Sequence, residues 1–354
     1  MKKNVTMKDI ADKANVSLST VSLCLNNSGR ISIETRKKVL KLAKKLNYVP
    51  NLAARELAGK SSDVIGIVLP DYGDIKTRKL LEGISEKSEN NNYFNLFCFT
   101  FNKADLGRTY INMLEGKNID ALIIFPYASL LNSISKETLY RIEDKGIPIV
   151  FVDTYQKGSR VPYVVSDNYR AAYDGVKYLI DSGHKNIAFV GGVYHSVGQE
   201  RFQGYSDALK ENDLYNKSLV YLGCEFDDSI YDIEEDIRSV FQKQEVSALM
   251  AYSRNATMAT ISQAKIFQKD DDFEIIGFDL LQDERFAGLS VYTYQQPHYE
   301  MGLKAVDIVL DKILRDKNIK EKKIRLETTF KPLSVVAKQR FALRKNSDGL
   351  SSAL

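Results

Sequence analysis

The sequence has few of the residues that disulfide frameworks and metal centres require, and no long apolar run. Among its 354 residues are three cysteines, Cys24, Cys98 and Cys224, which are too far apart for a metal-binding spacing. An odd number of dispersed cysteines also excludes a disulfide framework, so we expect a reducing cytoplasm. No apolar run reaches the roughly 18 residues that suggest a membrane-spanning helix. The N-terminal segment lacks the apolar stretch of a secretory signal, so we expect neither membrane association nor export.

Catalytic signatures are missing as well. The chain has no Gly-x-Ser-x-Gly elbow, no phosphate-binding Walker loop and no His/Cys cluster at metal-ligand spacing. Its three histidines, His184, His195 and His298, have no evident catalytic partners. We therefore expect a protein that is not an enzyme and that uses no metal and no cofactor.

Charge is distributed unevenly along the chain. Residues 1–60 contain thirteen Lys or Arg and four Asp or Glu, a balance of +9. Because the whole chain is +4, residues 61–354 carry −5. A basic head on an acidic body indicates that the head binds a polyanion such as nucleic acid, and a solvated basic surface is the alternative.

Capping residues and apolar spacing predict three helices in the head. Thr6 and Asp9 form a capping-box pattern before an apolar face, and Asn15 can end that helix in a left-handed conformation. Ser17 can begin a second helix two residues later, which gives a helix-turn-helix arrangement. Ser32 can begin a third helix, which has an apolar stripe and lysines mostly outside it.

The second helix has two leucines where water-facing residues are expected. Val21, Cys24 and Leu25 form its apolar face, whereas Leu18 and Leu23 lie among serines. If this helix enters a DNA major groove, the leucines can contact thymine methyl groups. The alternatives are isolated exposed apolar residues or contacts within a dimer.

From Val64 onward, short apolar runs alternate with helical patterns. The runs are rich in Val, Ile and Phe, which is typical of parallel strands covered by helices on both faces. Several end in Asp, Pro or Gly, where open α/β sheets place their ligand sites. The runs are 64-VIGIVLP-70, 96-LFCFT-100, 121-ALIIFP-126, 147-IPIVFVD-153, 187-IAFVGG-192, 246-VSALMAY-252 and 274-EIIGFD-279. They predict two α/β lobes.

Motifs spread between Val5 and Arg340 carry a family resemblance. They are 5-VTMKDIADKANVS-17, 20-TVSLCLN-26, 35-TRKKVLKLAKKLNYVPNLAARELAGK-60, 64-VIGIVLPD-71, 182-SGHKNIAFVGG-192, 201-RFQGY-205 and 276-IGFD-279. With these motifs the chain resembles the lactose-repressor (LacI/GalR) family of transcription regulators. The resemblance implies a cytoplasmic, nucleoid-associated bacterial protein that binds a pseudo-palindromic operator in double-stranded DNA. It also implies a homodimer, in some members a tetramer, that responds to a small molecule between its lobes.

The resemblance also implies a fold and its boundaries. We expect an all-α helix-turn-helix head at 1–49, a hinge helix and linker at 50–62, and a two-lobed α/β core at 63–342. The core is expected to resemble periplasmic sugar-binding proteins, with parallel sheets, and to sense a ligand and dimerise. One lobe is expected at 63–161 plus 292–324, and the other at 162–291 plus 325–342. Residues 343–354 look like a flexible tail.

The resemblance assigns DNA-contacting positions in the head. Base edges are expected to face Leu18, Ser19, Ser22 and Leu23, and the DNA backbone is expected to face Thr6, Ser17, Thr20, Asn26, Ser32 and Tyr48. The family usually has an arginine at position 23 that reads a guanine, which Leu23 cannot do. Arg30, just past the helix, can supply a substitute contact.

The segment 51–59 resembles the hinge helix, which in the family binds the minor groove as a pair. Leu57 matches the leucine that inserts into the base stack, with Ala54 facing the groove and Asn51 near the backbone. The alternative is that Leu57 packs within a linker. A helix this short would be ordered only beside its twin on DNA, so separating the pair would weaken operator binding.

Five positions are expected to line the ligand cleft. Arg201, Asp153 and Asp279 match cleft residues of the family, although each can instead be a cap or an ion-pair member. Lys76 and Arg254 depart from the family, because they replace an aromatic residue and a carboxylate. Tyr72 and Tyr252 can still supply an aromatic surface.

These departures favour an anionic ligand such as a sugar phosphate or an acidic sugar over a neutral monosaccharide. The alternative is that Arg254 pairs with Asp279 or Asp74. We expect a repressor of carbohydrate-utilisation genes. A regulator controlled by a non-sugar ligand or a partner protein, an activator, and a cytoplasmic solute-binding protein remain open.

Overall fold

In the computed structural model, the described residues are 5–25, 29–48, 61–71, 73–222, 230–242, 245–269, 272–281, 286, 288–319 and 322–347. The chain divides into two units, Met1–Ser62 and Asp63–Leu354. The division falls where the basic helical head gives way to buried strands. None of the described helices combines the length and the apolar character that crossing a lipid bilayer requires.

The first unit contains the helices α1 (Met7–Ala14), α2 (Leu18–Leu25) and α3 (Ile33–Lys45). α1 begins with the predicted capping box, in which the side chains of Thr6 and Asp9 accept hydrogen bonds from each other's backbone amides. It ends at Asn15, whose left-handed φ of 54° reverses the chain so that α2 can begin at Leu18. Small and apolar side chains from the three helices form one buried core: Ile10, Ala11, Ala14, Val21, Cys24, Val39 and Ala43.

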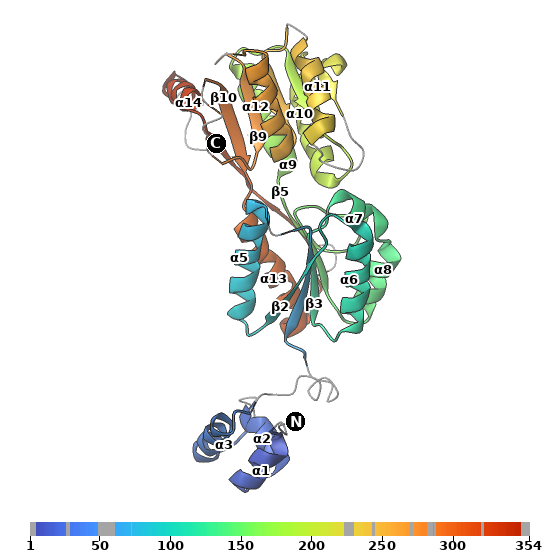
Figure 1. The fold of residues 1–354 in the computed structure, drawn as a ribbon, viewed down its shortest axis with the longest axis vertical. Helices are drawn as coiled ribbons and strands as arrows, with labels where there is room; N and C mark the ends of the chain where they lie inside the picture. The colour runs from blue at the N-terminus through green and yellow to red at the C-terminus, as the bar shows by residue number, and fades with distance from the viewer. Residues whose placement is uncertain are drawn as a thin grey trace. The chain divides into compact units, whose positions relative to one another are not determined.

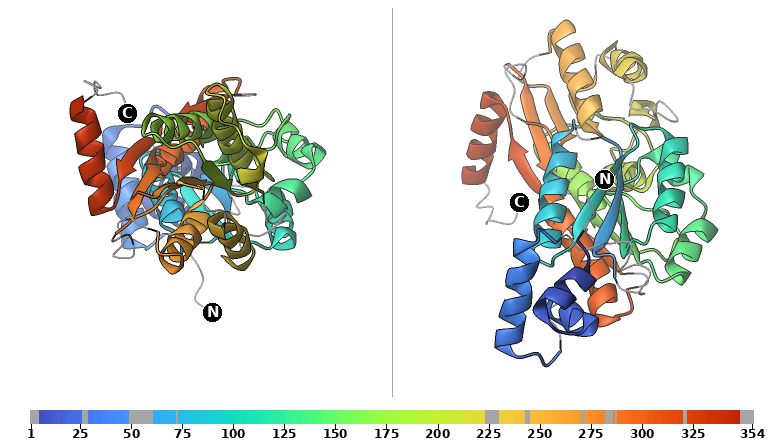
Figure 2. Two further views of the ribbon diagram at one scale, coloured as in Figure 1. Left: turned by 90° about the horizontal axis from the view of Figure 1, so that it is seen from above. Right: turned by 60° about the horizontal axis from the view of Figure 1, so that its bottom comes forward.

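The described residues of the second unit form two six-stranded sheets, one in each lobe. The first has the strand order β11-β5-β4-β3-β1-β2 and is parallel throughout. Its strands are β1 (Val64–Leu69), β2 (Phe94–Phe99), β3 (Ala121–Ile124), β4 (Ile149–Val152), β5 (Tyr163–Ser166) and β11 (Lys323–Leu326). One face is covered by α5 (Ile75–Glu89) and α13 (His298–Arg315), and the other by α6 (Ala104–Gly116), α7 (Ala128–Ser133) and α8 (Lys136–Asp144), as Figure 1 and Figure 2 show. Burial on both faces explains the unbroken apolar runs of the central strands.

The second sheet has the order β12-β10-β9-β8-β6-β7, and only β12 is antiparallel to its neighbour. Its strands are β6 (Ile187–Val190), β7 (Val220–Tyr221), β8 (Ala248–Ala251), β9 (Glu274–Phe278), β10 (Ser290–Gln295) and β12 (Thr329–Pro332). Its helices are α9 (Asn168–Asp181), α10 (Ser196–Lys210), α11 (Ile230–Gln242), α12 (Arg254–Ile266) and α14 (Val335–Ser347), with a 3₁₀ turn at Lys217–Leu219. This lobe has its own buried core.

All the predicted apolar runs form strands, but the lobe boundaries differ from the expected ones. β5 pairs with β4 in the first sheet, so the chain crosses to the second lobe after Ser166 rather than after residue 161. β10 pairs with β9 in the second sheet, so the return crossing follows Gln295 rather than residue 291. The last crossing lies between Leu326 and Thr329. Strand pairing decides these boundaries, and the sequence analysis missed both β5 and β10.

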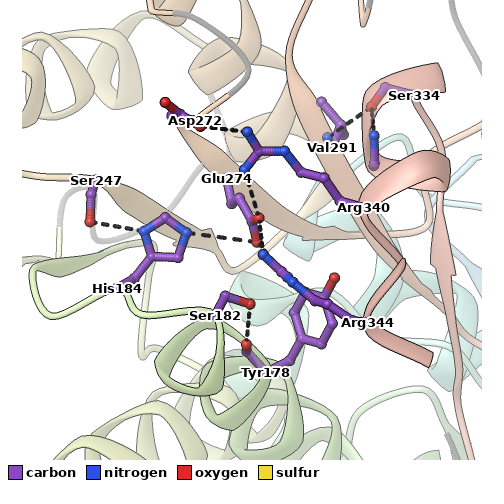
Figure 3. Close-up of polar contacts among 11 residues, drawn as sticks. Tyr178, Ser182, His184, Ser247, Asp272, Glu274, Val291, Ser334, Arg340 and Arg344 are labelled. Carbon is purple, nitrogen blue, oxygen red and sulfur yellow. Dashed lines mark hydrogen bonds and ion pairs between the residues drawn. The ribbon is translucent and has the colours of Figure 1, made fainter. Parts of the chain in front are cut away.

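The expectation of a flexible tail from residue 343 is wrong for residues 343–347, because α14 continues to Ser347. Figure 3 shows that two arginines of this helix reach Glu274 at the start of β9. The Nη2 atom of Arg344 lies 2.8 Å from Oε1 of Glu274, and the Nη1 atom of Arg340 lies 3.4 Å from the same oxygen. Arg340 also bonds Asp272. The ion pairs therefore attach the last helix to the second sheet.

Glu274 is fully buried, so its charge depends on these partners. Burial by itself would raise the pKa of the carboxyl, but His184 and Arg344 hold that pKa below its usual 4.5. The His184 ring is itself placed by a 3.0 Å hydrogen bond to Ser247, and the Arg344 guanidinium lies over the ring of Tyr178. A buried carboxylate that loses such partners becomes strongly destabilising.

Replacing Glu274 with Gln should lower the free energy of unfolding near pH 7 by roughly 3 kcal/mol, because two guanidinium groups lose their buried counter-charge. In the wild type, the stabilisation is fully present above pH 4.5, the usual pKa, and is lost as the pH falls through the lower pKa of the folded state. The difference between wild type and variant should therefore shrink in acid. Urea unfolding over a range of pH measures this difference, with Glu235→Gln on the exposed side of α11 as control. Equal losses in both variants, or a difference that does not change with pH, would contradict the assignment.

Candidate nucleic-acid interface and ligand cleft

Leu18 and Leu23 both lie on the exposed side of α2. The side chain of Leu18 is 52% exposed and that of Leu23 is 37% exposed, whereas Val21 and Cys24 on the opposite side are buried. Leu23 also packs against the loop before α3, since a Cβ added to Gly29 would lie 3.1 Å from a Leu23 methyl group. Leu18 therefore has no place in the head's own core, and Leu23 is only partly accommodated there.

Hydroxyl side chains flank Leu18 in the sequence at the start of α2. Ser17 accepts a 3.1 Å hydrogen bond from the backbone amide of Thr20 and so caps α2. Its Oγ atom also lies 2.7 Å from the hydroxyl of Ser19 and 2.8 Å from that of Thr20. Helix N-termini attract phosphate, because their amides carry partial positive charge. Thr6 and Ser17, which are predicted to contact the DNA backbone, each cap a helix, and both side chains remain exposed.

The remaining described head positions are placed as follows. Ser22 is half-buried on α2, and Arg30 is exposed next to Gly29. Tyr48 packs partly against the head core. Ser32 caps α3 by accepting a 3.1 Å hydrogen bond from the amide of Thr35. The lysines of α3 are all exposed and give the head a basic surface: Lys37, Lys38, Lys41, Lys44 and Lys45.

Four predicted DNA contacts lie outside the described residues, and their roles stay predictions. They are Asn26, Asn51, Ala54 and Leu57, and the predicted hinge segment 51–59 lies outside as well.

A cavity of about 440 Å³ lies between the two lobes of the second unit. Segments that follow β1, β3 and β4 of the first sheet line it, as do segments that follow β6, β8 and β9 of the second. It therefore lies at the carboxyl ends of parallel strands, where the sequence pattern placed a ligand site. All five predicted ligand residues line it: Lys76, Asp153, Arg201, Arg254 and Asp279.

Arg201 on α10 is the most buried charge in the cleft, with 3% of its surface exposed. Its Nε atom donates a 2.9 Å hydrogen bond to Asn168, Nη1 donates to the carbonyl of Tyr252, and the guanidinium lies 3.4 Å from the ring centre of Phe278. Among the described residues, its Nη2 atom has no hydrogen-bond partner. Burial lowers the pKa of Arg201 to about 10, opposed by Asp279 and Asp153, so the group remains charged at neutral pH.

Asp153 and Asp279 follow the corresponding strands β4 and β9 of the two lobes. Both have left-handed backbones, with φ values of 69° and 54°, which turn the chain sharply at the end of the strand. Asp153 lies 3.6 Å from Nε2 of His298, an ion-pair distance longer than a hydrogen bond. Burial alone would raise the pKa of Asp153, but His298, Lys76 and Arg201 hold it well below its usual value. Asp279 accepts hydrogen bonds from the backbone and side-chain amides of Gln296.

The two departures from the family pattern, Lys76 and Arg254, both lie at helix N-termini in the cleft. The Nζ atom of Lys76 is 4.0 Å from the carboxylate of Asp74, which also caps α5. Arg254 is the first residue of α12 and is exposed. Within the described part of the chain, no ion pair joins Arg254 to Asp74 or Asp279. The geometry thus disfavours the alternative in which Arg254 closes the cleft without a ligand.

The sequence analysis missed Gln296 and His298, which contact the two cleft aspartates. They follow β10, whose mixed sequence 290-SVYTYQ-295 is not an unbroken apolar run. Tyr194 also lines the cavity, and its place just after β6 was a usable signal. Tyr252 lines the cavity as suggested, and Tyr72 lies outside the described residues.

Two family models match this chain. The model of bacterial regulatory proteins of the lacI family matches residues 6–51. The model of periplasmic binding proteins and the sugar-binding domain of the LacI family matches residues 62–331. Together they cover both units of the structure.

Individual relatives agree with the family models. The chain is 32% identical over 305 residues to the HTH-type transcriptional regulator RegA of Clostridium acetobutylicum, covering 84% of this chain and 89% of the relative. It is 29% identical to catabolite control protein A of Priestia megaterium, covering 86% and 92%. The lac repressor dimer bound to operator and the anti-inducer ONPF has the same fold, with a TM-score of 0.76, 19% identity, and coverage of 94% and 99%.

The residues matched by the two family models begin in the helix-turn-helix head and end in β12, so they include both lobes of the core. The chain therefore belongs to the lacI family of bacterial regulatory proteins and is a DNA-binding transcriptional regulator, not an enzyme.

Proposed function

We propose that the protein is a repressor that binds a pseudo-palindromic operator as a homodimer in the bacterial cytoplasm. The observation that carries this proposal is the exposed Leu18 on a hydroxyl-bearing, capped helix, in a head whose α3 lysines are all exposed. An apolar side chain on such a surface fits thymine methyl groups, and the lysines fit phosphates. The similarity to an operator-bound repressor dimer supports the same way of docking.

A homodimer is supported by the edge of the first sheet. β2 is the edge strand, and its same-face residues Phe94 and Leu96 are 69% and 43% exposed. Apolar side chains on an open edge favour association, so a monomer with this surface would be prone to aggregation. A second copy of the chain would cover them and would bring a second head to the other half of a symmetric operator.

We also propose that the effector is a polyhydroxylated molecule with an anionic group, such as a sugar phosphate or an acidic sugar. The inner cleft offers Asp153 and Asp279 as acceptors for hydroxyls and the Nη2 atom of Arg201 as a donor. Lys76 and Arg254 supply cations at the two lobes. Because a guanidinium matches phosphate and carboxylate geometry, Arg254 is suited to the anionic group.

Selection from random duplexes should return a two-fold symmetric site that binds two chains. The affinity should fall by roughly 10³-fold between about 50 and 200 mM salt, because phosphate contacts release counterions. Lys41→Ala in the head should reduce the salt dependence, whereas Lys217→Ala in the core should not. One chain per duplex would refute the dimer, and a salt-independent affinity would refute phosphate binding by the head.

Replacing Leu23 with Arg should shift operator preference toward guanine at one symmetric position in each half-site. The expected discrimination is about 1–3 kcal/mol per bidentate contact. The control is Leu40→Arg, which adds the same charge at an exposed position of α3. Both variants should gain general DNA affinity, but only Leu23→Arg should change the selected sequence. If its selected site equals that of the parent, residue 23 does not read a base.

Replacing Arg254 with Ala should weaken binding of an anionic sugar about tenfold or more, since a hydrogen bond to a charged group contributes about 1.5–3 kcal/mol. Calorimetric titration with a panel of sugar phosphates, sugar acids and their neutral parent sugars measures this. Arg315→Ala is the control, because Arg315 pairs with Asp311 at the end of α13 opposite His298, and neither residue lines the cavity. Tight binding of a neutral sugar that Arg254→Ala leaves unchanged would exclude the anionic class.

A further inference from the structure

Five side chains connect the two lobes beside the cleft, and we name them the inter-lobe cluster. The first lobe contributes Thr154, Tyr155 and Arg325, and the second contributes Ser196 and Glu200 from the start of α10. The cluster lies next to the ligand residues in sequence, because Asp153 precedes Thr154 and Arg201 follows Glu200.

The contacts in the cluster are short and directional. The two Nη atoms of Arg325 donate to the two carboxylate oxygens of Glu200 at 2.8 and 2.7 Å, a bidentate ion pair. The hydroxyl of Tyr155 donates to Oε1 of Glu200 at 2.8 Å. The hydroxyls of Thr154 and Ser196 are 2.7 Å apart and buried, and Ser196 also accepts from the amide of Tyr155.

The position of Tyr155 is itself fixed by packing in the first lobe. Its ring stacks on that of Tyr163 with a centroid separation of 4.0 Å and an interplanar angle of 10°. Tyr163 is the first residue of β5, which pairs with β11, the strand that carries Arg325. The first-lobe half of the cluster is therefore attached to sheet strands rather than to a free loop.

The two lobes depend on such contacts for their relative orientation. Each lobe has its own buried core, and the described strands place three short crossings between them, after Ser166, Gln295 and Leu326. Short crossings act as hinges and leave the angle between rigid lobes to the non-covalent contacts. A bidentate ion pair tolerates little displacement, so it favours one angle over others.

We propose that the inter-lobe cluster holds the lobes in one orientation and couples the ligand site to that orientation through α10. Glu200 and Arg201 are consecutive residues of one helix, so a ligand that moves Arg201 also moves the carboxylate that Arg325 holds. The part that concerns the ligand rests on the proposed function. Glu200, Tyr155 and Arg325 are thus positioning residues, which act on the cleft without lining it.

The test measures the distance between spin labels at Lys117→Cys in the first lobe and Lys217→Cys in the second, with the native cysteines replaced by alanine. Both labelled positions are exposed. Glu200→Gln and Arg325→Lys each remove the bidentate ion pair and keep side chains of similar size. The matched control is Arg170→Lys, because Arg170 pairs with Asp174 within α9 in one lobe.

We expect one narrow distance distribution for the parent and for Arg170→Lys, and a shifted or broadened one for Glu200→Gln and Arg325→Lys. The double variant should resemble each single variant, because both remove the same ion pair. Should Arg325→Lys fail to fold, Glu200→Gln decides alone. Distributions that match the control in both variants would overturn the proposal.

A second measurement separates this proposal from the proposed function. Affinity for the sugar phosphates and sugar acids of the panel, measured by calorimetric titration, should change in Glu200→Gln and stay at the parent value in Arg170→Lys. If the parent binds none of these sugars, the proposed effector class fails, and the distance distributions still decide the cluster. If the distances change and the sugar affinity does not, the coupling part of the proposal is overturned.

Discussion

Arg201 places a positive charge where only 3% of its surface reaches solvent, and the inner cleft is arranged around that charge. A buried guanidinium is tolerated only where partners replace water. Here those partners are the amide oxygen of Asn168, the carbonyl of Tyr252 and the ring of Phe278. They come from α9 and from the ends of β8 and β9, so the second lobe must be folded before the site exists.

Polar residues of the head have two roles, because those that begin its helices as caps also lie on its exposed surface. Ser17 caps α2 and is exposed, as are its neighbours Leu18 and Ser19. A cap fixes the backbone at the start of the helix, so the side chains near that end have defined directions. The capping hydrogen bonds that stabilise this short helix therefore also fix the directions of its exposed side chains.

Local signals in the sequence were sufficient for much of this fold. The capping box at Thr6, the left-handed Asn15 and the apolar runs each depend on neighbouring residues, and each was predicted correctly. The five cleft positions came from the family resemblance, and all line one cavity. The crossings between the lobes were predicted at the wrong residues, because the lobe to which β5 and β10 belong depends on the strands they pair with. His298, Gln296 and the role of Arg344 depend on contacts distant in sequence, which no local pattern encodes.

The order of the strands along the chain has a consequence for synthesis. β11 completes the first sheet and β12 the second, yet both lie more than 250 residues after the start of β1, and α14 follows them. Neither lobe can reach its final pairing until these late strands have been synthesised, whereas the head is contiguous and can fold as soon as it emerges. A nascent chain therefore carries a folded basic head and two incomplete sheets, and premature termination would release a head without a competent sensor.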